Sequence, residues 1–72
     1  MKKKMKPSYA IKFRNFCHNN NYRANDIAKI LSVSPITVYG YWSGRAKVPD
    51  EYKIILEKEI GLDIYDTFYK EL

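Results

Sequence analysis

The sequence has little that would crosslink or metallate a small protein. Cys17 is its single cysteine and His18 its single histidine, so one chain cannot form a disulfide or supply a zinc-ligand set. Neighbouring helical residues point about 100° apart, so this pair does not have the geometry of a nucleophile and its base. We expect Cys17 to be a core thiol and His18 to face solvent. Nothing else resembles an acid–base pair, a phosphate-binding glycine loop or a metal site, so we expect no enzyme, cofactor or small-molecule ligand.

Long apolar runs are also missing. No stretch approaches the roughly 18 apolar residues needed to span a bilayer, and the opening "MKKKMKPS" lacks the apolar region of a signal peptide. We therefore expect a cytoplasmic protein with no membrane partner. At 72 residues the chain suits one small domain, because such a chain buries only about 60% of its unfolded surface. Dimerisation would add to its stability.

Acidic residues are scarce in the first two thirds of the chain. Between residues 1 and 49, Asp26 is the one acid against ten lysines and arginines, which leaves a net charge of +9. Residues 50–72 carry seven acids and three lysines, a net charge of −4. This asymmetry predicts a polyanion-binding surface in the first part, with the acidic part facing solvent or a partner chain.

Helix signals begin after a basic arm. Residues 1–7 lack any apolar period and are expected to be flexible, whereas residues 8–72 form the domain. Ser8 is the expected N-cap of a first helix, and Asn21 in "HNNN" is the expected left-handed residue after its end. The apolar side of this helix is formed by Tyr9, Ala10, Ile11, Phe13, Phe16 and Cys17.

Two short helices separated by a tight turn are predicted next. The first covers about 24–31, with Ile27, Ala28, Ile30 and Leu31 on its buried side. In "SVSP", Ser34 is a suitable N-cap and Pro35 suits the first helical position, where a missing N–H costs nothing. The second covers about 35–43 and ends at Gly44. Its expected buried residues are Val38, Tyr41 and Trp42, and its expected outward residues are Ile36, Thr37, Tyr39, Gly40 and Ser43.

Two further helices complete an all-α prediction of about five helices. A helix is expected over about 50–60, ending at Gly61, with Ile54, Ile55, Leu56 and Ile60 turned toward the core. Asp63 is then expected to cap a short last helix, with Asp66 three residues later in a weak capping box. Ile64 and Phe68 repeat along one side of this helix.

The ordered set "DIAKIL", "VS", "TVYGYWSGR", "VP" and "EIGLDI" resembles the Cro/CI-type (XRE-like) helix-turn-helix domains of phage and bacterial repressors. The resemblance covers residues 22 to about 68. It implies a compact five-helix lambda-repressor-like fold and a DNA-binding transcriptional regulator of the Cro/repressor type, acting as a dimer on double-stranded DNA. Two positions depart from the family pattern: Ala24 replaces the usual Gln, and Ser32 replaces the usual Gly between the two helices.

The resemblance also implies roles for individual residues, because the third helix of this family lies in the major groove. The base-facing residues would be Pro35, Ile36, Thr37, Tyr39 and Gly40. The residues against the DNA backbone would be Arg23, Lys29, Ser34, Ser43, Arg45 and Lys47. Further candidates are Lys2, Lys3, Lys4 and Lys6 of the arm for DNA, and Ile64, Tyr65, Phe68 and Tyr69 for a homodimer.

The expected base-facing residues leave two functions open. Arg, Lys, Asn and Gln make most specific base contacts, and none of them is found in residues 35–43. A helix of this kind suits thymine methyl groups or DNA shape rather than strong base-by-base readout. Alternatively, the same apolar face binds another protein, for example as an antagonist of a repressor.

Overall fold

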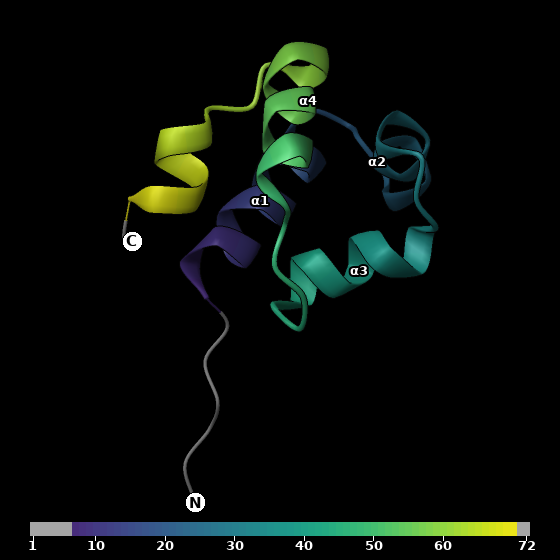
Figure 1. The fold of residues 1–72 in the computed structure, drawn as a ribbon, viewed down its shortest axis with the longest axis horizontal. Coiled ribbons are helices and arrows are strands. Elements are labelled where there is room, and N and C mark those ends of the chain that lie inside the picture. The colour runs from purple at the N-terminus through teal and green to yellow at the C-terminus, as the bar shows by residue number, and fades with distance from the viewer. Residues whose placement is uncertain (1–6, 71–72) are drawn as a thin grey trace, which may run out of the picture.

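The computed structural model describes residues 7–70, and every regular element in that range is helical. The order is α1 (Ser8–Asn19), α2 (Ala24–Leu31), α3 (Pro35–Ser43), α4 (Asp50–Ile60) and a short π-helix, η1 (Tyr65–Tyr69) (Figure 1). The all-α prediction with five helices is therefore confirmed for this range. The arm lysines Lys2, Lys3, Lys4 and Lys6 lie outside the described residues. No helix in residues 7–70 is long and apolar enough to cross a membrane.

The core is built around α1, which lies between α3 and η1 (Figure 1). α2 packs on both α3 and α4. Phe13 and Cys17 of α1 are fully buried, as are Ile27 of α2 and Leu56 of α4. The Phe13 ring makes edge contacts with Trp42 on one side and Phe68 on the other, at centroid distances of 6.1 and 6.0 Å. One aromatic side chain thus joins three elements.

The bounds predicted for α2 and α3 are confirmed, and local capping explains them. The Ser34 hydroxyl accepts a hydrogen bond from the Thr37 N–H at 3.4 Å, and Pro35 is the first residue of α3. Ser32 ends α2 in the left-handed conformation, with φ of 59°. That conformation costs a residue with a Cβ about 1–2 kcal/mol, which glycine at this position would avoid. The predicted left-handed residue Asn21 is also confirmed, with φ of 64°.

Two sequence predictions about helix faces and ends were wrong. Ser8 is the first residue of α1 rather than its cap, because the extended Pro7 precedes the helix and its carbonyl accepts the Ala10 N–H at 3.0 Å. Ile54 is 54% exposed rather than turned to the core. Leu56 and Ile60, four residues apart, define the buried side of α4. Ile54 is two positions before Leu56 and therefore points away from that side.

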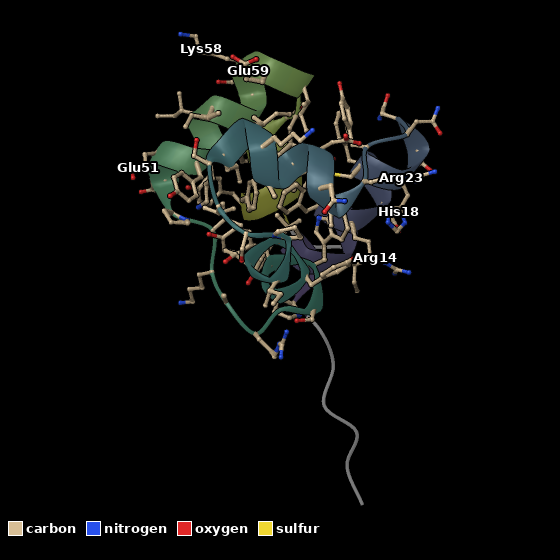
Figure 2. All side chains as sticks on the ribbon, turned by 90° about the vertical axis from the view of Figure 1, so that its right-hand side faces the viewer. Arg14, His18, Arg23, Glu51, Lys58 and Glu59 are labelled. Carbon is tan, nitrogen blue, oxygen red and sulfur yellow. The ribbon has the colours of Figure 1, made fainter. Side chains whose placement is uncertain are left out.

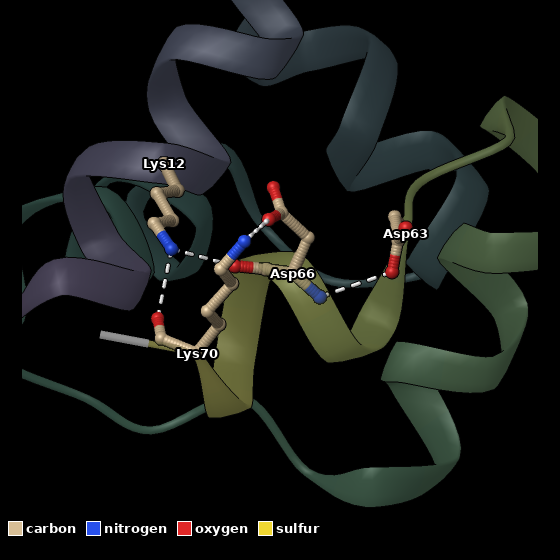
Figure 3. A network of polar contacts seen from close by, with 4 residues as sticks. All are labelled: Lys12, Asp63, Asp66 and Lys70. Atoms are coloured by element: carbon tan, nitrogen blue, oxygen red, sulfur yellow. Dashed lines mark hydrogen bonds and ion pairs between the residues drawn. The ribbon is translucent and has the colours of Figure 1, made fainter. Parts of the chain in front are cut away.

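The segment after α4 is tied to α1 by polar contacts (Figure 3). The Lys12 ammonium donates hydrogen bonds to the carbonyls of Asp66 and Lys70, both at 2.8 Å. The Asp63 carboxylate accepts the Asp66 N–H at 3.0 Å, which confirms the predicted cap. The Lys70 N–H bonds to the Tyr65 carbonyl five residues earlier, so this last turn is a π-helix instead of an α-helix.

Gly40 is buried, which corrects its prediction as an outward, base-facing residue. The chain folds back after α3, and the Gly40 carbonyl accepts the N–H groups of Arg45 and Ala46 at 3.0 and 3.2 Å. Ala46 therefore covers the helix surface at Gly40. A Cβ at Gly40 would lie 3.7 Å from the Ala46 Cβ, an ordinary contact, so no clash requires glycine here.

Alanine at Gly40 and alanine at Gly44 are expected to change stability in opposite directions. Gly40→Ala should raise the free energy of unfolding by about 0.5–1 kcal/mol, because a helical alanine replaces glycine and its methyl group fits. Gly44→Ala should lower it by more than about 1 kcal/mol, since Gly44 has φ of 85° and a Cβ there would clash with the Pro7 ring. Urea unfolding followed by circular dichroism measures both changes. Destabilisation by Gly40→Ala would contradict this account of Gly40.

Candidate nucleic-acid interface

The outward face of α3 is apolar near its start. Ile36 is 75% exposed, the largest value for any large hydrophobic side chain in residues 7–70, and Tyr39, one turn later, is 56% exposed. Pro35 and Thr37 are half-buried. The Thr37 hydroxyl lies 3.2 Å from the Ser34 hydroxyl, so the two share a hydrogen bond at the start of the helix. This face meets solvent mainly through Ile36 and Tyr39.

An open cleft of about 610 Å³ lies beside this face, and we call it the arginine cleft. It is lined by Arg14, His18, Arg23, Ala24, Tyr39, Trp42, Ser43 and Arg45. The three arginines come from α1, from the residue before α2 and from the loop after α3. Figure 2 shows Arg14, His18 and Arg23 on one side of the molecule and Glu51, Lys58 and Glu59 on the other. No carboxylate lines the cleft, so its lining is positively charged.

The arginines of the cleft have no acidic partner in residues 7–70. The ion pairs in that range join Lys53 to Asp50 and Lys70 to Asp66. The Arg45 Nε donates to the Ser43 hydroxyl at 3.2 Å, and that hydroxyl donates to the Gly40 carbonyl at 3.1 Å. These two bonds position Arg45 at the end of α3 without neutralising it. Three guanidinium groups are therefore available to an anionic ligand.

Aromatic rings form the wall between the cleft and the core. Trp42 is only 5% exposed, which confirms its prediction as a core residue. His18 and Tyr39 both meet its ring edge to face, at centroid distances of 5.3 and 5.9 Å. The Tyr39 ring therefore packs against Trp42 and forms part of the cleft lining. The Trp42 indole N–H is buried and has no hydrogen-bond acceptor among residues 7–70.

Cys17 has no reactive role in this arrangement. Its side chain is fully buried, and burial raises the pKa of the thiol to about 12. The thiolate needed for nucleophilic attack is therefore nearly absent at neutral pH. The predictions of a core thiol at Cys17 and an exposed His18 are confirmed.

Within residues 7–70, no group of three His, Cys, Asp or Glu side chains is placed to hold a metal ion.

The structure brings some of the predicted DNA contacts together and separates others. Arg23, Tyr39, Ser43 and Arg45 all line the arginine cleft. The other residues predicted to contact the DNA backbone lie outside the cleft: Ser34 caps α3, Lys29 is exposed on α2, and Lys47 lines a second groove with Lys53 and Phe68.

Arg14 and His18 were missed by the sequence prediction, although both line the cleft. Their spacing of four residues places them on one face of α1, which is the signal that the sequence offered. Ala24 is buried at 4% exposure, and its methyl group offers no hydrogen-bond donor.

The four candidate dimer residues differ in how much of each side chain is exposed. Tyr65 and Tyr69 are 67% and 58% exposed. Phe68 packs inside the domain, with its ring 6.0 Å from those of both Tyr9 and Phe13, and Ile64 is half-buried. The two tyrosines are therefore the candidates with free surface.

A solved structure of similar fold is the crystal structure of a transcriptional regulator from Listeria innocua. The TM-score is 0.78 at 24% sequence identity, and the match covers 94% of this chain and 65% of that one. This chain thus spans just under two thirds of that protein. No family model and no curated protein matches the sequence. The likeness establishes the fold, and the predicted compact helix-turn-helix arrangement, with α2 and α3 as its two helices, is confirmed.

Proposed function

We propose that this protein is a DNA-binding transcriptional regulator of the Cro/repressor type. In this proposal α3 lies in the major groove of double-stranded DNA and the arginine cleft binds the phosphate backbone beside it. The observation that carries the proposal is the set of three arginines, Arg14, Arg23 and Arg45, from three separate elements and with no carboxylate among them. Their position next to the exposed face of a helix-turn-helix supports the same function.

Guanidinium groups suit this task because their planar donors match phosphate oxygens in pairs. Arg23 and Arg45, predicted from the sequence, bind phosphate together with Arg14, and Ser43 positions Arg45. Lys29 and Lys47 add weaker electrostatic attraction from their exposed positions. Pro35, Ile36, Thr37 and Tyr39 remain the residues proposed to meet the groove.

The proposed active form is a homodimer on a roughly palindromic site, because two copies double the contacts of a small domain. Tyr65 and Tyr69 are its proposed interface, in the acidic last third of the chain. Binding of the dimer would occlude a promoter and so prevent transcription from it. The arm lysines Lys2, Lys3, Lys4 and Lys6 are proposed to add contacts with the DNA backbone.

Footprinting of the DNA bound in cells tests this function. The proposal expects discrete protected sites that share a sequence and lie near promoters. The absence of any protected duplex would contradict it.

The exposure of Ile36 and Tyr39, 75% and 56%, favours one alternative, a protein-interaction module on the same fold. Paired variants separate the two functions. Loss of function on changing Arg45 and Lys47 to glutamate would support DNA binding. Loss of function on changing Ile36 to aspartate and Tyr39 to alanine, but not on changing Arg45 and Lys47, would support a protein partner.

A further inference from the structure

The outward face of α3 presents few groups that could form hydrogen bonds with bases. Of the five residues expected to face bases, Gly40 is covered by Ala46 and the Thr37 hydroxyl is engaged with Ser34. The Tyr39 ring packs against Trp42 and lines the arginine cleft. The side chain that projects freely from the first turn of α3 is Ile36, with the half-buried Pro35 beside it.

An exposed branched apolar side chain in this position has one good match on a major-groove edge. The edges of the four bases present hydrogen-bond donors and acceptors, and thymine alone adds an apolar group, its C5 methyl. Ile36 has no hydrogen-bonding group, so it gains nothing from guanine, adenine or cytosine edges. Covering a thymine methyl group removes apolar surface of both partners from water.

We infer that this protein selects its DNA sites through thymine C5-methyl groups, and that Ile36 is the residue that reads them. The inference rests on the proposed DNA-binding function and adds the chemistry of its specificity. Charge complementarity identifies the occupant of this face. Tyr39 and Ser43, on the following turns of the same helix, line the positively charged cleft, so a polyanion held there brings its groove against Ile36.

Replacing thymidine by deoxyuridine in a bound duplex removes only this methyl group and keeps base pairing. A duplex enriched from a random pool by the wild-type chain is resynthesised with deoxyuridine at one position at a time, and affinities are measured by fluorescence anisotropy. Burial of one methyl group contributes about 0.8 kcal/mol to the binding free energy. Its removal therefore corresponds to an affinity loss of about fourfold at each position that Ile36 covers. We expect enrichment of thymine at those positions and no loss elsewhere.

Two variants assign the effect to a residue. Ile36→Ala should bind the thymidine and deoxyuridine duplexes equally well, close to the affinity of the wild type for the deoxyuridine duplex. Ile54→Ala, which shortens another exposed isoleucine on α4, should keep the full discrimination of the wild type. Both positions are solvent-exposed, so neither change should unfold the domain.

Two results would overturn the inference while leaving DNA binding intact. One is a wild-type chain that binds its enriched duplex and is indifferent to deoxyuridine at every position, as expected if Ile36 meets a protein. The other is an Ile36→Ala chain that still discriminates. Failure to enrich any duplex would instead contradict the proposed function itself, and the inference with it.

Discussion

Changing Arg23 and Arg45 together to glutamate is expected to weaken binding to duplex DNA by roughly 10²–10⁴-fold at low salt. Each arginine supplies a charge-assisted hydrogen bond to phosphate worth roughly 1.5–3 kcal/mol, and two such bonds are lost. Both side chains are exposed, and neither forms an ion pair in residues 7–70, so the fold should be retained. Anisotropy titrations with labelled duplex DNA measure the loss, and circular dichroism checks the fold.

Lys58→Glu provides the matched control for the single variant Arg45→Glu. Each substitution changes the net charge by the same amount, but Lys58 is on the opposite side of the molecule from the arginine cleft (Figure 2). We expect Arg45→Glu to lose at least tenfold in affinity and Lys58→Glu only a few-fold, through the general change in charge. Equal losses in the two variants would show that DNA binding depends on net charge and not on the cleft.

Phe13→Ala is expected to leave little folded protein at room temperature. Phe13 is fully buried, and its ring contacts Trp42 of α3 and Phe68 of η1. Truncation of a buried phenylalanine costs about 3–5 kcal/mol, which is comparable to the roughly 3–5 kcal/mol that a core of this size supplies. Thermal and urea unfolding, followed by circular dichroism, should show a lost or strongly shifted transition.

Ile54→Ala is the control for this stability change. Ile54 is 54% exposed on α4, so its truncation should change the free energy of unfolding by less than about 1 kcal/mol. A loss below 1 kcal/mol for Phe13→Ala would contradict the central position of α1 in the core.

The parts of the fold that could be predicted from the sequence are those governed by local chemistry. The bounds of α3 followed from the Ser34 cap, from Pro35 after it and from Gly44 at its end, and those of α2 from its apolar periodicity. Asn21 and Asp63 likewise act through their own backbone neighbours, at the end of α1 and before η1. Short-range signals of this kind do not depend on how distant segments pack.

The parts that could not be predicted depend on contacts between distant segments. Helical periodicity places Gly40 outward, and only the return of the chain at Ala46 covers it. The arginine cleft requires the packing of α1 against α3, which brings Arg14 and Arg45 into the lining of one cleft across more than thirty residues of sequence.

The salt dependence of DNA binding measures directly how many phosphates the arginine cleft contacts. Each phosphate contact contributes about −0.9 to the slope of log affinity against log salt concentration. With three arginines of each protomer on phosphates, the wild type should show a slope of about −2.7 per bound protomer or steeper. Arg14→Ala, Arg23→Ala and Arg45→Ala should each reduce it by about 0.9 per protomer. Lys58→Ala should leave the slope nearly unchanged. A wild-type slope near zero, or three arginine variants with the wild-type slope, would contradict the assignment of the cleft to the DNA backbone.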